Sequence, residues 1–263
     1  MNGAFYIGAT GLRAQQSGVD LIANNIANMN TPAFKRASVS FAELVSAPSE
    51  TTSSGRSAAA SAAAAGGMFG VTFGAPQQVF TSGSFRQTDD PLDLAIRGNG
   101  FIELMGANGK TVLWKGGKLK INQDGFLATA SGTQLKATIS VPHDAEKLTV
   151  NENGKVFAKV AGQAEPQEIG QIDLVVPGDT RELKALGDGV YGVNENYTDL
   201  TRSTPGEDGS AAGTLAQGFS ETSNVQLPDE LVNLMMLQRA YAANARAVQA
   251  GDELMSIANG LKR

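Results

Sequence analysis

The sequence predicts an α+β protein with a long helix at each end and a β-rich middle. Three observations support this fold class. Apolar residues recur every seven positions near both ends, turn dipeptides separate alternating segments in the middle, and a stretch of small residues follows the first helical region. An apolar stripe on a helix must be buried, and one helix pair covers only part of two stripes. The helices could bury their stripes in a core within one chain or by packing against other molecules.

The N-terminal region (1–45) begins with a predicted helix and continues into the stretch ANNIANMNTPAFKR (23–36), in which asparagines interrupt the apolar pattern. Asparagine is a poor helix former and is costly to bury unless its amide is hydrogen-bonded. We expect Asn30 to adopt the left-handed turn that ends the helix, because Pro32 prevents its continuation. The heptad-spaced stripe consists of Phe5, Leu12, Val19 and Ile26, with Ile22 and Met29 in the offset row.

The C-terminal region (221–263) predicts a second helix. Pro228, Asp229 and Glu230 suit a first helical turn, and Gly260 suits a helix end. Its stripe consists of Leu227, Leu234, Tyr241, Val248 and Met255, with Leu231 and Ala245 in the offset row. Polar residues lie in or beside this stripe, either as a solvated face or as hydrogen-bonding groups that fix the register between helices: Gln238, Arg239 and Asn244.

The segment 46–76 is rich in small residues. Its first part, SAPSETTSSGRSAAASAAAAGG (46–67), contains no large apolar side chain and cannot bury a core alone. It is either a disordered loop or a segment that becomes ordered only against neighbouring molecules. The glycine-rich GGMFGVTFG (66–74) lets a backbone approach its neighbours closely.

Region 77–220, with a core at about 91–185, predicts an antiparallel β domain. Three dipeptides suit the positive φ angles of tight hairpin turns: Asn108-Gly109, Asp124-Gly125 and Asn153-Gly154. Alternating apolar residues flank them, for example Leu148 and Val150 before the third turn. The Gly-x-Gly of RGNGF (97–101) predicts a bend in a strand rather than a nucleotide-binding loop.

Composition excludes several classes of function. The formal net charge of −5 and the pI near 5.0 argue against nucleic-acid binding. There are no cysteines, and the single histidine, His143, reads as a surface loop residue. No apolar run reaches the length of a membrane helix, and the N-terminus lacks the features of a cleaved secretory signal. We find no nucleophile or phosphate-binding motif, and expect no enzymatic activity, cofactor or metal.

Three stretches resemble the signatures of bacterial flagellar rod and hook proteins, the axial proteins of the flagellum. LIANNIANMNTPAFKR (21–36) resembles their N-terminal signature, SETSNVQLPDELVNLMMLQRAYAANARAV (220–248) their C-terminal signature, and LDLAIRGNGFIEL (92–104) the motif at which their β domain begins. The three occur in the family's order. Within the family, the chain length, the residues of the C-terminal motif and the small-residue insert are most similar to those of the distal rod subunit. Proximal rod subunits and a divergent paralogue are the alternatives.

Two positions depart from the family pattern. The family usually has glycine after the Thr-Pro or Thr-x pair, where this chain has Ala33. The family's Tyr-Thr-Arg-Asp-Gly stretch is replaced here by LWKGGKLKIN (113–122). Outside the family, a β-rich extracellular binding module would need a clustered aromatic surface, and a wall-cutting hydrolase would need a second catalytic domain. The sequence shows neither feature.

The resemblance implies a structural subunit that polymerises helically into the rod, the periplasm-spanning drive shaft of the flagellum. The terminal helices would form a coiled-coil-like inner domain and the inserted β domain would lie outside it. The implied partners are further copies of the chain, other rod proteins, the hook protein, the P- and L-ring proteins and the flagellar export apparatus, with no nucleic acid and no membrane insertion. The implied export uses the type III apparatus without a cleaved signal.

The resemblance also suggests roles for individual residues. Those expected to pack subunits together are the helix residues Phe5, Leu12, Val19, Ile22, Ile26, Leu231, Leu234, Tyr241, Val248 and Met255. Those expected to set register through polar contacts are Asn24, Asn25, Asn28, Gln238, Arg239 and Asn244.

Overall fold

The computed structural model describes residues 2–44, 70–106, 109–162, 165–193, 199–206 and 211–260. Most of the predicted 46–76 segment, and Asn108 of the first predicted turn, lie outside the described residues. The chain divides into two compact units, which we call the helical unit (Met1–Ile26, Ala37–Gln77 and Gln226–Arg263) and the β unit (Ala27–Arg36 and Gln78–Val225). The β unit thus includes residues 27–36, which the sequence pattern had grouped with the N-terminal helix.

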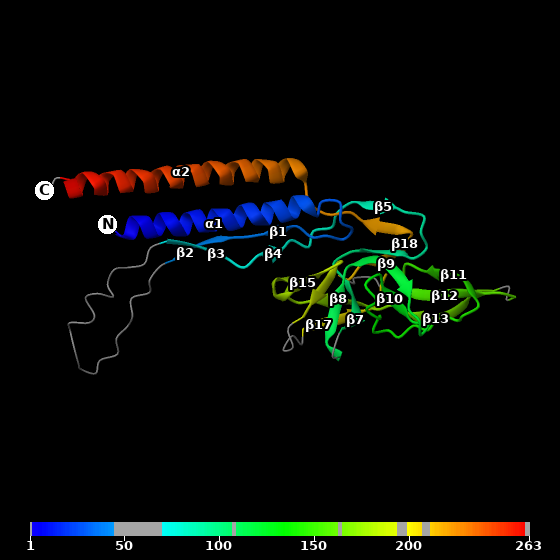
Figure 1. The fold of residues 1–263 in the computed structure, drawn as a ribbon. Coiled ribbons are helices and arrows are strands. Elements are labelled where there is room, and N and C mark those ends of the chain that lie inside the picture. Colours follow the sequence, from blue (N-terminus) through cyan, green and yellow to red (C-terminus); the bar gives the residue numbers. More distant parts are fainter. Residues whose placement is uncertain are drawn as a thin grey trace, which may run out of the picture. The chain divides into compact units, whose positions relative to one another are not determined.

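The helical unit contains both long helices, α1 (Asn2–Ala27) and α2 (Leu227–Gly260). Figure 1 shows them side by side, with the two chain termini at the same end, so they run antiparallel. As predicted, Pro228 lies in the first turn of α2 and Gly260 at its end. The unit also holds the antiparallel pair β2 (Phe41–Leu44) and β3 (Gly70–Phe73). Neither helix, over its described residues, is long and apolar enough to cross a membrane.

The β unit is built from short antiparallel strands in three main sheets. Their orders are β10-β9-β6-β18, β11-β12-β13 and β15-β16-β8-β7-β14-β17, and β5 pairs separately with β19. The bounds are β5 (Phe85–Gln87), β6 (Asp93–Arg97), β7 (Phe101–Met105), β8 (Thr111–Trp114), β9 (Gly116–Ile121), β10 (Leu127–Thr129), β11 (Ala145–Val150), β12 (Lys155–Val160), β13 (Gln167–Gln171), β14 (Leu174–Pro177), β15 (Lys184–Gly187), β16 (Val190–Gly192), β17 (Leu200–Ser203), β18 (Thr214–Gln217) and β19 (Phe219–Glu221). A 3-10 turn, η2 (Thr180–Glu182), precedes β15. Two short strands, β1 (Ala37–Ser38) and β4 (Gln77–Gln78), lie where the chain passes between the units in sequence.

Two of the predicted hairpins are confirmed. Asp124-Gly125 connects β9 to β10 and Asn153-Gly154 connects β11 to β12, and both glycines have positive φ angles of 80° and 82°. Leu148 and Val150 are buried on β11, as the alternation predicted. The RGNGF segment does not bend a strand. It links β6 in the four-stranded sheet to β7 in the six-stranded sheet.

The main hydrophobic core of the β unit joins the three sheets. It takes Leu94 and Ile96 from β6, Leu104 from β7, Trp114 from β8 and Val156 from β12. All are at most 2% exposed. Because Trp114 is the only tryptophan in the chain, its fluorescence reports on the folding of this unit alone.

Candidate functional site

The two helices pack by setting glycines of one helix against larger side chains of the other, among them Phe5 and Val248 of the predicted stripes. A γ-methyl of Val248 occupies the space where a β-carbon on Gly8 would lie, and the Asn244 Nδ2 lies 2.9 Å from the corresponding point on Gly11. The Phe5 ring lies 3.8 Å from that point on Gly251. These pairs follow one antiparallel register, since each step of three residues along α1 is matched by a step of three or four residues backward along α2. Glycine allows two backbones to approach closely.

The buried stripe of α1 runs through Gly11, Ala14, Gly18, Ile22 and Asn25, which lie three or four residues apart. Of the residues predicted to pack, only Ile22 is buried, at 5% exposure. The others on α1 flank this stripe and are half-buried: Phe5, Leu12, Val19 and Ile26. The heptad count missed the centre of the stripe because glycine and alanine add little to an apolar pattern.

Helix α2 leaves large apolar side chains exposed. Among the predicted packing residues, Leu234, Val248 and Met255 are half-buried, whereas Leu231 and Tyr241 are 44% and 42% exposed. We call the exposed apolar residues of this helix the open face of α2; besides Leu231 and Tyr241 it comprises Val232, Met235, Met236, Leu254 and Ile257. Such a density of exposed methionine and aliphatic residues on one helix is typical of a surface that another chain covers.

Asn25 holds the chain after the helix in place. Its Oδ1 accepts from the Ala37 amide at 3.0 Å, and its Nδ2 donates to the Ala37 carbonyl at 2.9 Å and to Glu230 Oε2 at 3.5 Å. Both Asn25 and Glu230 are at most 1% exposed. A buried amide that satisfies both backbone groups of one residue acts like a strand partner for that residue.

The other polar candidates differ in their surroundings. Asn24, Gln238 and Arg239 are exposed, and Asn244 is half-buried beside Gly11. Asn28, which belongs to the β unit, accepts from the Thr31 amide through its carbonyl at 3.1 Å and from the Thr31 hydroxyl through its Oδ1 at 3.2 Å. A role for these residues in setting register between subunits stays a prediction.

The left-handed residue after α1 is Ala33 and not Asn30, so that prediction was wrong. Ala33 has a φ angle of 56° and is 3% exposed, and its β-carbon lies 3.4 Å from the point where a β-carbon on Gly189 would stand. Its amide donates to the Glu221 carbonyl at 2.8 Å. Glycine adopts this backbone conformation without strain, which accounts physically for the glycine that the family usually places here.

Segments 33–36, 79–83 and 221–224 meet in the β unit, and we call this meeting point the buried junction. Asn224 Oδ1 accepts from the Arg36 amide at 2.7 Å, while its Nδ2 donates to the carbonyls of Val79 at 2.7 Å and Thr81 at 3.0 Å. The Asn224 amide thus uses both of its hydrogen-bonding ends to connect the N-terminal and C-terminal signatures to the strand region between them.

An ion pair lies at the centre of the junction. Lys35 Nζ is 2.7 Å from Glu221 Oε1, and both side chains are 1% exposed. Lys35 also donates to the Thr81 carbonyl at 3.0 Å, and Glu221 Oε1 accepts from the Gly83 amide at 2.8 Å. A buried pair of this kind is strongly destabilising when only one partner is removed, because the other charge is left without water or counter-ion.

A second buried lysine lies near this pair. Lys115 is 1% exposed, donates to the carbonyls of Gly98 and Gly100 at 2.8 and 2.9 Å, and lies 4.6 Å from the centre of the Phe101 ring. Burial lowers the pKa of Lys115 to about 7, helped by the charge of Lys35 and opposed by that of Glu221. The RGNGF segment, which the sequence predicted to be a bend in a strand, therefore supplies two carbonyls to an internal amine.

Tyr191 packs edge-on against Phe80 and Phe101, with ring centres 5.1 and 5.8 Å apart. Burial, with a further contribution from Glu221, raises the pKa of its phenol well above the usual range. No arrangement in the described chain points to catalysis. His143 is exposed in a turn, and the described residues include no cluster of three or more acidic or histidine side chains placed to hold a metal.

Comparison with known proteins identifies the family. Three family profiles match the chain: "Flagella basal body rod protein" at residues 5–35, "Flagellar hook protein FlgE/F/G D1 domain" at 95–158 and "Flagellar basal body rod FlgEFG protein C-terminal" at 216–261. The chain belongs to the flagellar basal-body rod protein family. The predicted family is confirmed, and with it the prediction of a structural rod protein.

Individual relatives match over nearly their whole length. A flagellar basal-body rod protein FlgG from Caulobacter vibrioides is 33% identical over 97% of both chains. FlgG proteins from Borreliella burgdorferi and Bacillus subtilis are 32% and 30% identical and cover 99% of this chain, and 98% and 99% of their own lengths. The N-terminal profile covers most of α1 and continues to Lys35, and the C-terminal profile covers α2 and residues 221–224. Of the buried junction, only Arg36 and segment 79–83 lie outside these two profiles. The two terminal signatures therefore meet physically at the Lys35–Glu221 pair.

Proposed function

We propose that this chain is a subunit of the distal rod, polymerising helically into the shaft that carries torque from the motor to the hook through the P and L rings. In this assembly α1 and α2 form a coiled-coil-like inner layer and the β unit lies outside it. Export through the flagellar type III apparatus, without a cleaved signal, and contacts with other rod proteins and the hook protein belong to the same proposal. Full-length similarity to FlgG proteins supports it.

The observation that carries the polymer proposal is the open face of α2. Met236 is 64% exposed and Met235 51%, although both lie on a helix of 34 residues. Exposed apolar surface of this kind gains free energy when it is covered, at roughly 25 cal/mol per Å². Further copies of the chain supply the cover, because the inner layer of a helical polymer brings equivalent helices side by side.

The polar candidates fit the same proposal. Apolar contacts are non-directional, whereas a shaft under torque must keep its register. Exposed Asn24, Gln238 and Arg239 are therefore proposed to hydrogen-bond between copies, while half-buried Asn244 is proposed to fix the register of α1 against α2 within one copy. Folding of the terminal helices is proposed to be coupled to assembly, so the helix content measured by circular dichroism rises on polymerisation. Equal helix content in monomer and polymer refutes that coupling.

A matched pair of variants tests the proposed role of α2. Met236 and Leu186 are both 64% exposed, but Leu186 lies on β15 of the β unit. Met236→Glu places a charge on the open face and should prevent polymers from forming, as seen by negative-stain electron microscopy, whereas Leu186→Glu should leave polymers intact. Trp114 fluorescence confirms that the β unit is folded in both. Normal polymers from Met236→Glu contradict the proposal.

A proximal rod subunit or a divergent rod paralogue is the second candidate. The specific observation in its favour is a relative named FlgF from Caulobacter vibrioides, 29% identical over 97% of this chain and 95% of its own length. The position of the protein in isolated basal bodies separates the two. A distal rod subunit is expected to be essential for the hook and to lie inside the outer rings, whereas a proximal subunit is expected to lie below them.

A further inference from the structure

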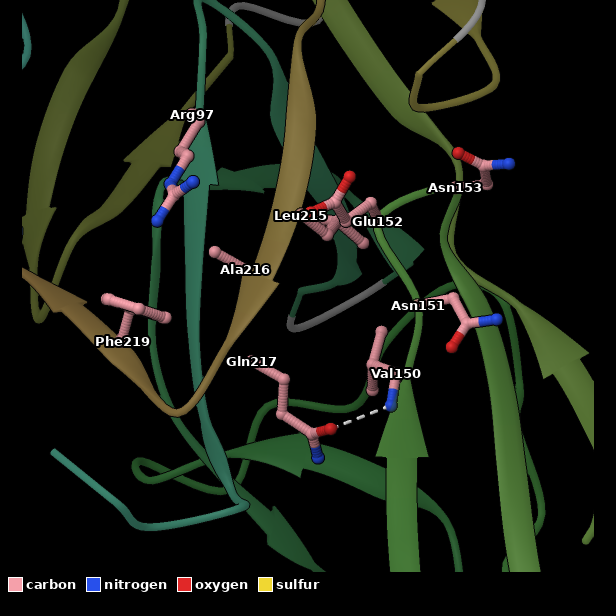
Figure 2. Close-up of a pocket in the computed structure, with 9 residues that line it drawn as sticks. All are labelled: Arg97, Val150, Asn151, Glu152, Asn153, Leu215, Ala216, Gln217 and Phe219. Atoms are coloured by element: carbon pink, nitrogen blue, oxygen red, sulfur yellow. Dashed lines mark hydrogen bonds between the residues drawn. The ribbon is translucent and has the colours of Figure 1, made fainter. Parts of the chain in front are cut away.

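A hollow of about 540 Å³ lies in the β unit between β18 and the β11–β12 hairpin. β18 and β11 are the outer strands of their two sheets, and the hollow opens between them (Figure 2). The Leu215 amide donates to the Glu152 carbonyl at 3.1 Å, and Gln217 Oε1 accepts from the Val150 amide at 2.9 Å. Gln217 Nε2 donates to the carbonyls of Leu148 at 3.0 Å and Pro91 at 2.6 Å. These hydrogen bonds fix the distance between β18 and the β11–β12 hairpin.

Arg97 lines this hollow from β6, across β18 from the hairpin, and its side chain extends toward Phe219 (Figure 2). The guanidinium carbon lies 4.9 Å from the centre of the Phe219 ring and 5.7 Å from that of Phe85. These two rings come from the β5–β19 pair and orient a side chain that is otherwise exposed. Among the described residues, no carboxylate lies within ion-pair distance of Arg97.

An oriented guanidinium with free N–H groups is a receptor for a carboxylate. Its planar donors match the two oxygens of one carboxylate, and aromatic contacts reduce the side-chain entropy lost on binding. Phe219 and Leu215 add apolar surface, whereas the side chains of Asn151 and Asn153 on the hairpin point away from β18 (Figure 2). Glu152 on the hairpin is the one lining acid, so an incoming carboxylate is favoured on the Arg97 side.

We propose that the Arg97 hollow binds an aspartate or glutamate side chain of a second copy of this chain in the polymer. The inference rests on the proposed rod function. Each copy carries 26 acidic and 21 basic residues, so carboxylates are in surplus on the partner. A helical polymer joins unlike faces of neighbouring copies, so the Arg97 side of the hollow on one copy meets a different surface of the next. This contact would tie neighbouring β units together, separately from the helices.

A zero-length cross-link tests the proposal. Arg97→Lys keeps the positive charge but introduces an amine, which a carbodiimide joins to any carboxylate in direct contact. Polymers are assembled from equal amounts of unlabelled and ¹⁵N-labelled Arg97→Lys protein, treated with carbodiimide and digested. Mass spectrometry then identifies cross-links at position 97 and shows from mixed labelling whether they join two copies. The control is Arg86→Lys, since Arg86 is an exposed arginine on neighbouring β5 that does not line the hollow.

The expected result is a mixed-label cross-link from position 97 to an aspartate or glutamate, present in polymers and absent from monomers and from the Arg86→Lys control. Polymers that form but show no position-97 cross-link, or only one to Glu152 of the same copy, overturn the inference and leave the rod function standing. A cross-link only to a different protein in rods isolated from cells also overturns it. Failure of the unsubstituted chain to polymerise overturns the rod proposal itself.

Discussion

Removing Lys35 tests the buried junction most sharply. Lys35→Met replaces the amine by an apolar side chain of similar length and leaves the Glu221 carboxylate at 1% exposure. Only the Gly83 amide then donates to Glu221 Oε1 among the contacts described, and Oε2 has no hydrogen-bond partner within the described residues. Breaking one half of a buried pair costs about 3–5 kcal/mol.

The neighbouring Lys115 reduces that cost. In the intact protein the charge of Lys35 lowers the pKa of Lys115, so its removal allows Lys115 to hold its proton and serve as the counter-ion of Glu221. We therefore expect a loss near the lower limit, about 3 kcal/mol. For a domain of this size, that loss lowers the melting temperature by roughly 6–12 °C.

The assay is urea unfolding of the full chain followed by Trp114 fluorescence, which reports on the β unit. A double-mutant cycle adds Glu221→Gln and the Lys35→Met/Glu221→Gln pair, and should give a coupling energy of about 2 kcal/mol. Lys118→Met is the matched control, because Lys118 and Asp90 lie at the same 2.7 Å but are 59% and 33% exposed. We expect little measurable effect there. A Lys35→Met cost below about 1 kcal/mol refutes the role given to the pair.

Three further predictions concern single residues. Asn25→Ala removes both hydrogen bonds to the Ala37 backbone and should destabilise the helical unit by about 2 kcal/mol, seen in circular dichroism melts, with Arg13→Ala at an exposed position of the same helix as the control. The pKa of Lys115 falls from 10.5 to about 7 on folding, so between these pH values the unfolded chain binds the extra proton and stability rises with pH, by at most about 1.4 kcal/mol per unit. Lys115→Met should remove this slope in urea titrations at pH 7.5 and 9.5, and an unchanged slope contradicts the assignment. Ala33→Gly relieves left-handed strain of about 1–2 kcal/mol but loses a buried methyl group and makes the unfolded chain more flexible, so the free energy of unfolding should change little. Ala33→Val adds a branched side chain in the same backbone conformation and should lower the free energy of unfolding strongly.

Much of the fold could be predicted from local signals. Heptad spacing indicated both helices, and Asp-Gly and Asn-Gly dipeptides marked two hairpins correctly, because positive φ angles restrict which residues can occupy such turns. The family followed from two long terminal motifs with unusual residue content. These signals are encoded in short stretches, so one sequence is enough to read them.

The candidate site was harder, because its contacts join distant residues. Lys35 and Glu221 are each ordinary charged residues in the sequence, and only the fold places them 2.7 Å apart. Asn25 was singled out as an unusual amide, but a role between subunits was predicted where the structure shows a bond to Ala37 of the same chain. Arg97 belongs to the RGNGF motif, but the sequence did not single out its side chain, since its two aromatic partners lie on β5 and β19.

Ala33 shows how a departure from a pattern can be understood only in three dimensions. In the sequence it was an alanine at a family glycine position. In the structure it is a left-handed residue whose methyl group fits against Gly189, and whose amide binds the strand that carries Glu221. The position needs a particular backbone conformation rather than a particular side chain, and a small β-carbon is tolerated at the cost of strain.

Cysteine accessibility tests the central claim, that the open face of α2 is covered by further copies of the chain. The chain contains no cysteine, so Met236→Cys and Leu186→Cys each introduce a single thiol at side chains of equal, 64% exposure. Maleimide labelling should be fast at both positions in the monomer. In polymers of the purified protein it should be strongly slowed at position 236 and remain fast at position 186. Equally fast labelling of position 236 in monomer and polymer would contradict the account.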